Sequence, residues 1–149
     1  MPEQLTQGRI LRAVREIEMP ALDIQVQPGE RTLVNIPTIL YTQPRAVTRT
    51  VDLLGHEITV EATATSFTWH HGDGSSQVTT RPGRPYPAKD VTHTYDATAE
   101  SVRPRVDTTY TVRYRVDDGD WSDLGDTLTA TGTPTALEVR QAAPVLTRR

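Results

Sequence analysis

The stretch FTWHHGDG, residues 67–74, decides how the rest of this chain is interpreted. It has the form of a β-strand closed by a tight turn, because aromatic and β-branched residues give way to Gly-Asp-Gly. Gly72 and Gly74 are expected to adopt positive φ, and the Asp73 carboxylate is expected to accept backbone N–H groups of the same turn. Trp69 is predicted to lie in the core, because its ring can fill the space between two sheets in a chain that is only 5% aromatic.

Two later stretches complete the pattern: VTHTY at 91–95 and YTVRYRV at 110–116. Both combine β-branched and aromatic residues with polar ones in the alternation expected of half-buried strands. His93 and Tyr95 are two residues apart, so they point to the same face of their strand. One of them is expected to pack inward and to cap the turn with a hydrogen bond.

Together these stretches resemble the PKD (polycystic kidney disease) domain, in which a strand ending in Trp-x-x-Gly-Asp-Gly is followed by a Val-x-His-x-Tyr strand and a Tyr-x-Val strand. The resemblance is strong over 66–116. This chain has His70 and His71 where the family usually has an acidic and an aromatic residue. The long connection 79–90 resembles versions found in cell-surface proteins of actinomycetes. The resemblance implies an Ig-like β-sandwich that works outside the cell.

The remaining sequence has the same character, with period-two alternation between turns rich in Gly, Pro and Asp. Seven to nine short antiparallel strands without intervening helices are typical of an all-β sandwich, so this is the predicted fold class. The strands are expected at 22–26, 31–41, 46–53, 56–64, 66–71, 91–95, 109–116, 127–131 and 135–139.

Three segments are predicted. The sandwich is expected over 21–140, with a tail over 141–149. Residues 1–20 form an arm or linker, in which near-helical spacing of apolar residues allows a short helix before Pro20.

Composition excludes several classes of function. The net charge of −3 gives no electrostatic footprint for nucleic acid, which is therefore not expected as a partner. Cysteine is absent, so neither a disulfide framework nor a thiolate zinc site is expected. No segment is apolar and long enough to span a membrane, and the N-terminal residues lack the pattern of a signal peptide.

Two kinds of metal site can be considered, although none is predicted and no cofactor is expected. His56, His70, His71 and His93 suggest zinc, but adjacent residues of a strand project to opposite faces and cannot easily share one ion. The acidic turn 117–120 offers carboxylate oxygens of the kind that calcium prefers, without the spacing of an EF-hand, and calcium binding there stays open.

The sequence contains no nucleophile elbow, phosphate-binding glycine loop or metalloprotease helix, so a non-enzymatic function is predicted. The resemblance implies a cell-surface or secreted module for protein–protein or protein–glycan contacts or for spacing. Its contacts are expected in the loops 81–89 and 118–123. The candidate contact residues are Trp121, Arg81, Arg84 and Tyr86, with the alternative that Trp121 only covers the sheet edge.

A structural subunit of a virion or a surface filament is the alternative function. Met1 without an export signal, an amphipathic arm at 9–17 and an extended tail after Pro144 support that alternative. It would involve self-assembly and a location in the virion.

Overall fold

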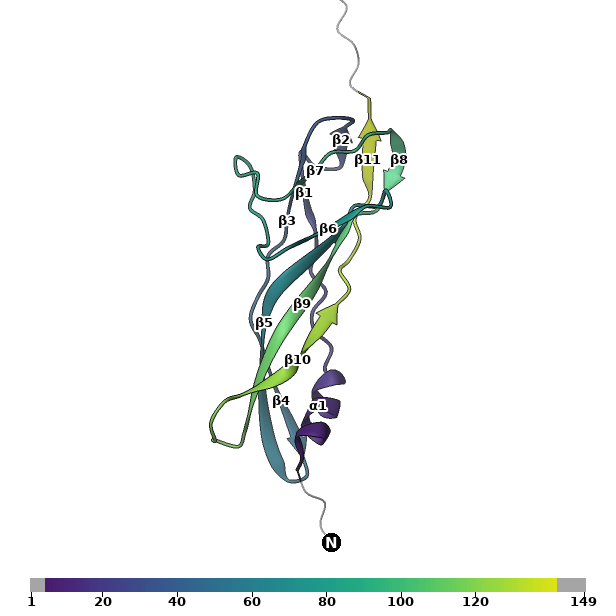
Figure 1. Cartoon of the computed structure of the whole chain (residues 1–149). Coiled ribbons are helices and arrows are strands. Elements are labelled where there is room, and N and C mark those ends of the chain that lie inside the picture. Colours follow the sequence, from purple (N-terminus) through teal and green to yellow (C-terminus); the bar gives the residue numbers. More distant parts are fainter. Residues whose placement is uncertain (1–4, 142–149) are drawn as a thin grey trace, which may run out of the picture.

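The computed structural model describes residues 5–141 and contains one helix and eleven strands in an elongated arrangement (Figure 1). The all-β fold is as predicted, with more strands than the seven to nine expected. The elements are α1 (Gln7–Arg15), β1 (Gln25–Gln27), β2 (Arg31–Leu33), β3 (Thr38–Tyr41), β4 (Val47–Leu53), β5 (His56–His70), β6 (Ser76–Thr79), β7 (Thr92–His93), β8 (Ala99–Val102), β9 (Arg105–Val116), β10 (Ser122–Ala130) and β11 (Leu137–Arg140).

The main sheet is antiparallel, in the order β10-β9-β5-β4, and β6 also pairs with β5. The strands expected at 56–64 and 66–71 are one continuous strand, β5. Between Ala64 and Ser66 the register with β9 shifts by one residue, which is a β-bulge at Thr65. The bulge reverses the alternation, so Ala62 is buried before it and Phe67 after it, and the sequence pattern therefore resembles two separate strands.

Two three-stranded sheets complete the fold, β1-β3-β7 and β2-β11-β8. The strand expected at 31–41 is divided into β2 and β3 by a turn in which Asn35 adopts a φ of 65°. The hydroxyl groups of Thr32 and Thr38 lie 2.5 Å apart and join the two parts. β11 pairs with β2 in parallel, which departs from the all-antiparallel expectation. β6 and β8 were not predicted, because their short sequences follow turn residues and show little alternation.

The helix α1 packs on the main sheet. Thr6 caps its first turn by accepting a hydrogen bond from the backbone N–H of Arg9. Ile10 and Val14 lie one turn apart and are buried, with 4% and 1% exposure. They join a core cluster with side chains from all four central strands: Val47, Ile58, Val60, Ala62, Tyr110, Val112, Leu124 and Ala130. The predicted arm therefore contains a short helix, Gln7–Arg15, that packs against the core of the main sheet.

Two further clusters fill the other half of the molecule. One contains Leu22, Ile24, Leu40, Phe67, Trp69, Val91 and Val106. The other contains Tyr95, Val102, Leu137 and Val139 and lies under the β2-β11-β8 sheet. The predicted tail beyond Gln141 lies outside the described residues.

The two ends of the molecule differ. We call one the helix end, which carries α1, the β4–β5 turn at Leu54–Gly55 and the β9–β10 turn at 117–120 (Figure 1). The opposite one, the loop end, carries the turn between β1 and β2, the turn before β3 and the loop between β6 and β7.

Candidate functional site

The residues of the Gly-Asp-Gly turn form a sandwich corner. Trp69 has no exposed surface, and its indole N–H donates to the hydroxyl of Thr79 at 2.9 Å. Gly72 and Gly74 have φ values of 84° and 91°, and a Cβ atom on Gly72 would lie 2.8 Å from the backbone nitrogen of Arg103. The residues of the motif therefore meet a packing requirement of the fold.

The Asp73 carboxylate ties this turn to β7. One of its oxygens accepts from the backbone N–H of Ser75 at 2.9 Å and from the Ser75 hydroxyl at 2.5 Å. The other lies 2.8 Å from Nε2 of His93. Burial by itself would raise the pKa of Asp73, but the hydrogen bonds from Ser75 and His93 outweigh it and lower that pKa to about 2.

His71 is the other half of the corner, with 2% exposure. Its ring stacks on that of His93, and the edge of Tyr95 meets His93 with ring centroids 4.6 Å apart. The Tyr95 hydroxyl donates to the backbone carbonyl of His71 at 2.7 Å, and burial raises the pKa of that hydroxyl. Burial and then the neighbouring His93 lower the pKa of His71 to about 4, so its ring is neutral at pH 7.

The four histidines do not gather around one point. His56 contacts Asp117 at 2.9 Å, His70 contacts Asp107 at 3.0 Å, and the other two stack on each other. Among residues 5–141 there is no group of three or more His, Cys, Asp or Glu side chains arranged to hold a metal ion.

The loop between β6 and β7 builds a surface groove. Thr42 and Leu40 of the β3 region donate backbone N–H groups to the carbonyls of Pro82 and Val91, which fastens both ends of the loop. Arg84 binds Asp90 through two hydrogen bonds of 2.7 and 3.0 Å. The backbone N–H of Tyr86 donates to the side-chain oxygen of Gln27 at 2.6 Å.

This groove has a volume of about 530 Å³ and is predominantly apolar. Ile36 and Tyr86 are 50% and 68% exposed beside it. Its lining residues come from β1, the turn before β3, and the loop: Gln27, Pro28, Ile36, Pro37, Ile39, Tyr86 and Lys89. We call it the loop-end groove.

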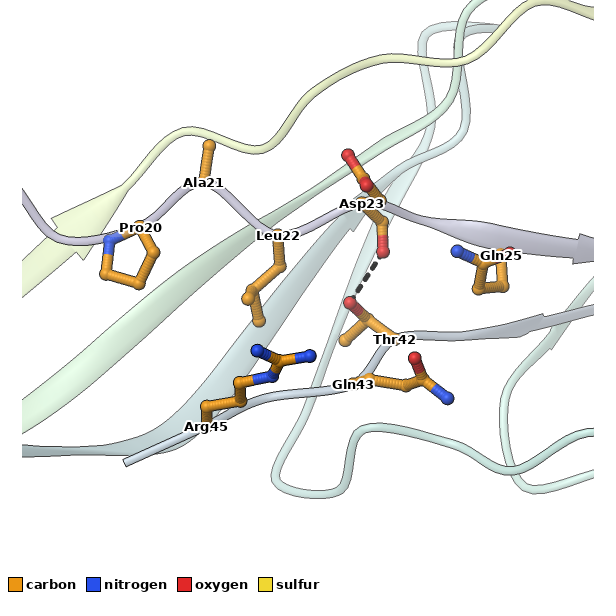
Figure 2. Close-up of a pocket in the computed structure, with 8 residues that line it drawn as sticks. All are labelled: Pro20, Ala21, Leu22, Asp23, Gln25, Thr42, Gln43 and Arg45. Atoms are coloured by element: carbon orange, nitrogen blue, oxygen red, sulfur yellow. Dashed lines mark hydrogen bonds between the residues drawn. The ribbon is translucent and has the colours of Figure 1, made fainter. Parts of the chain in front are cut away.

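A second hollow is more polar. Figure 2 shows it between the segment that leads into β1 and the segment that follows β3, with a volume of about 270 Å³. The Thr42 hydroxyl donates to the carbonyl of Asp23 at 2.7 Å and joins the two segments. Because this hydroxyl already has a partner, and Asp23 and Arg45 form no ion pair within residues 5–141, we see no converging set of binding groups there.

Trp121 lies far from the loop-end groove, in the β9–β10 turn at the helix end (Figure 1). It is half-buried beneath two guanidinium groups, with Arg113 at 4.3 Å and Arg115 at 5.0 Å from its ring. The structure therefore brings Tyr86 and Arg84 into one loop but separates them from Trp121. Arg81 lies exposed at the start of that loop.

Lys89 lies in the predicted contact loop 81–89, but sequence reasoning missed Ile36 and Ile39 as lining residues of the groove. Ile36 and Ile39 were assigned to a strand, where an apolar residue is expected to be buried. Pro37 was the available signal, because a proline within an apolar stretch marks a place where a strand is interrupted and a side chain can become exposed.

Comparison with protein-family models, curated proteins and solved structures found no match to this chain. Within the described residues, no helix is long and apolar enough to cross a membrane.

Proposed function

We propose that this chain is a non-catalytic, PKD-like β-sandwich module that makes protein–protein contacts, or holds partners apart, at a cell surface or outside the cell. The loop-end groove is the observation that carries this proposal. Exposed apolar side chains beside a mainly apolar depression are typical of protein contact sites, because their burial on binding is favourable. A glycan would find few polar partners there.

The polar residues of the corner support a structural role in place of chemistry. In a hydrolytic triad the nucleophilic hydroxyl donates to the imidazole, which removes its proton. Here the Ser75 hydroxyl donates to Asp73, and His93 is held between the ring of His71 and the edge of Tyr95. Because the Ser75 hydroxyl bonds to the carboxylate and not to an imidazole, it has no general base, and we assign Asp73 and His93 to stabilising the turn.

The shape favours a second candidate, a structural subunit of a surface filament or a virion. The two ends carry different surfaces, and the long β5 and β9 strands connect them (Figure 1). A module of this shape can join one neighbour at each end. The two candidate functions imply different locations: the contact module would lie at a cell surface or outside the cell, and the structural subunit would lie in a surface filament or a virion.

Site-specific photocrosslinking tests the contact function. A photoreactive amino acid at position 86 is expected to crosslink a protein partner in the source organism, whereas the same amino acid at position 78 is expected not to. Val78 is a matched control because it is 67% exposed but lies on β6, outside the groove. Equal crosslinking from both positions, or none from position 86, would count against a protein contact at the groove.

A further inference from the structure

Leu54 occupies an unfavourable backbone position at the tip of the β4–β5 turn. It has a φ of 51°, and Gly55 has a φ of 82°. Positive φ at both central residues indicates a type I′ turn, for which asparagine and glycine are the favoured residues. A leucine there is strained and is 40% exposed, so it stabilises neither the turn nor the core. Backbone strain at an exposed apolar residue points to a role for that side chain.

The turn is held in a fixed direction. The Asp117 carboxylate accepts from the backbone N–H of Glu57 at 3.0 Å and contacts His56 at 2.9 Å. The backbone N–H of Asp117 donates in return to the carbonyl of Glu57 at 2.6 Å. These bonds link the β4–β5 and β9–β10 turns, so Leu54 projects from a rigid pair of hairpins.

The opposite end offers a complementary surface. The loop-end groove is lined mainly by apolar and proline side chains and has one charged lining residue, Lys89. Lys89 is exposed and forms no ion pair within the described part of the chain.

The charged side chains beside Leu54 and in the loop-end groove have opposite signs. Asp52 and Glu57 are directly opposed in the register of β4 and β5, so both lie on one face beside Leu54. Both are exposed, and neither has an ion-pair partner between residues 5 and 141. A leucine flanked by two carboxylates without ion-pair partners therefore matches an apolar groove that is lined by one cationic side chain, Lys89.

We propose that the loop-end groove binds the β4–β5 turn of a second copy of this chain, with the Leu54 side chain in the groove and Asp52 and Glu57 facing Lys89. The inference rests on the proposed contact function and names its partner. Because the two surfaces lie at opposite ends of one molecule, the contact is head-to-tail and leaves a free turn and a free groove at the ends of every oligomer (Figure 1). Repetition produces a linear filament.

Two singly blocked variants test the contact on the full chain. Leu54→Asn removes the apolar side chain and suits the turn, whereas Ile36→Ser alters the groove at an exposed residue. By light scattering from about 10 μM to about 1 mM, the range of weak interfaces, the parent chain is expected to form growing oligomers. Each variant alone is expected to remain a monomer, with association weakened by at least about tenfold.

Mixing the two variants is the decisive step. The Leu54→Asn chain keeps an intact groove and the Ile36→Ser chain keeps an intact turn, so an equimolar mixture is expected to form dimers and nothing larger. Lys89→Glu is expected to weaken association of the parent chain, and Asp52→Lys with Glu57→Lys in the same chain is expected to restore it. Thermal melting curves verify that each variant is folded.

A parent chain that stays monomeric throughout, or a Leu54→Asn variant that associates like the parent, would overturn the proposal. The result also separates this inference from the contact function. A monomeric chain that still crosslinks another protein through position 86 retains the contact function and loses the head-to-tail contact. A monomeric chain without any crosslink loses both.

Discussion

The imidazole rings of His71 and His93 stack with their centroids 3.7 Å apart and their planes inclined by 2°. The stacked pair connects the end of β5 to β7. The Asp73 oxygen that contacts His93 connects the turn after β5 to the same strand, β7. The corner therefore contains a buried, stacked ring at position 71 that is also a titratable group.

The first prediction concerns acid sensitivity. In the folded chain the pKa of His71 is about 4, against 6.5 for a free histidine. Between pH 4 and pH 6.5 this side chain is therefore protonated in the unfolded chain and neutral in the folded chain. Stability is therefore fully present above pH 6.5 and decreases as the pH falls from 6.5 to 4, by as much as ~3 kcal/mol. Urea unfolding followed by tryptophan fluorescence at several pH values measures it.

The control for acid sensitivity is His71→Phe, which keeps a flat ring and removes the titration. Its stability is expected to change little between pH 6.5 and 4. Asp73 affects the stability in a separate pH range that lies below that of His71. Its pKa of about 2 in the folded chain, against 3.8, gives stability that is lost only as the pH falls from 3.8 to 2. An unchanged slope in the His71→Phe chain would exclude His71 as the source.

Tyr95→Phe tests the cap of the corner. It removes the hydroxyl that donates to the buried carbonyl of His71 and leaves that carbonyl without this partner, which is expected to cost about 1–2 kcal/mol of unfolding free energy. Tyr86→Phe is the matched control, because Tyr86 is 68% exposed. Its effect is expected to stay within about 0.5 kcal/mol. Equal effects of the two substitutions would show that the Tyr95 hydrogen bond contributes nothing.

Gly72→Ala and Gly74→Ala compare two glycines of one turn. Both have positive φ, so an alanine at either position costs about 1 kcal/mol of backbone strain. At Gly72 the added methyl group would also lie 2.8 Å from the backbone nitrogen of Arg103, whereas nothing lies within 4 Å at Gly74. We expect Gly72→Ala to lower the free energy of unfolding by at least about 2 kcal/mol, and Gly74→Ala by about half of that. Denaturant titration of the two variants measures the difference.

Ile10→Ala tests whether α1 belongs to the domain. Ile10 is 4% exposed and packs against the main sheet, so its truncation is expected to destabilise the chain by about 2–4 kcal/mol. Arg12→Ala, on the exposed side of the same helix, is the control and is expected to be nearly neutral. Thermal denaturation compares the two variants. An Ile10→Ala chain as stable as the parent would show that α1 does not contribute to the stability of the domain.

The roles of the residues in the Gly-Asp-Gly corner could be predicted from the sequence, but the residues of the exposed apolar surfaces could not. The roles of Trp69, Gly72 and Asp73 follow from local geometry, because a large ring, two glycines and a carboxylate have few uses at the end of a strand. Thr65 could not be recognised as a bulge, since an extra residue is defined only by the register with β9. Ile36 lies in an apolar stretch that was expected to be one strand, 31–41. Its exposure depends on where the chain turns and on which segments cover it, and this information is tertiary.

Trp121 gives the last prediction, because its two interpretations lead to different measurements. Arg113 and Arg115 lie over its ring, and Arg113 also binds Glu61 at 2.8 Å, so one face of the indole is occupied from within the chain. If Trp121 covers the sheet edge, Trp121→Ala removes both cation–π contacts and is expected to cost about 1–2 kcal/mol of unfolding free energy. A residue reserved for a partner would instead leave stability unchanged. We expect the first result, and Arg115→Gln, which keeps Arg113 in place, is expected to cause about half of the loss. Denaturant titration decides between the two interpretations, with the fluorescence of the buried Trp69 as the unfolding signal.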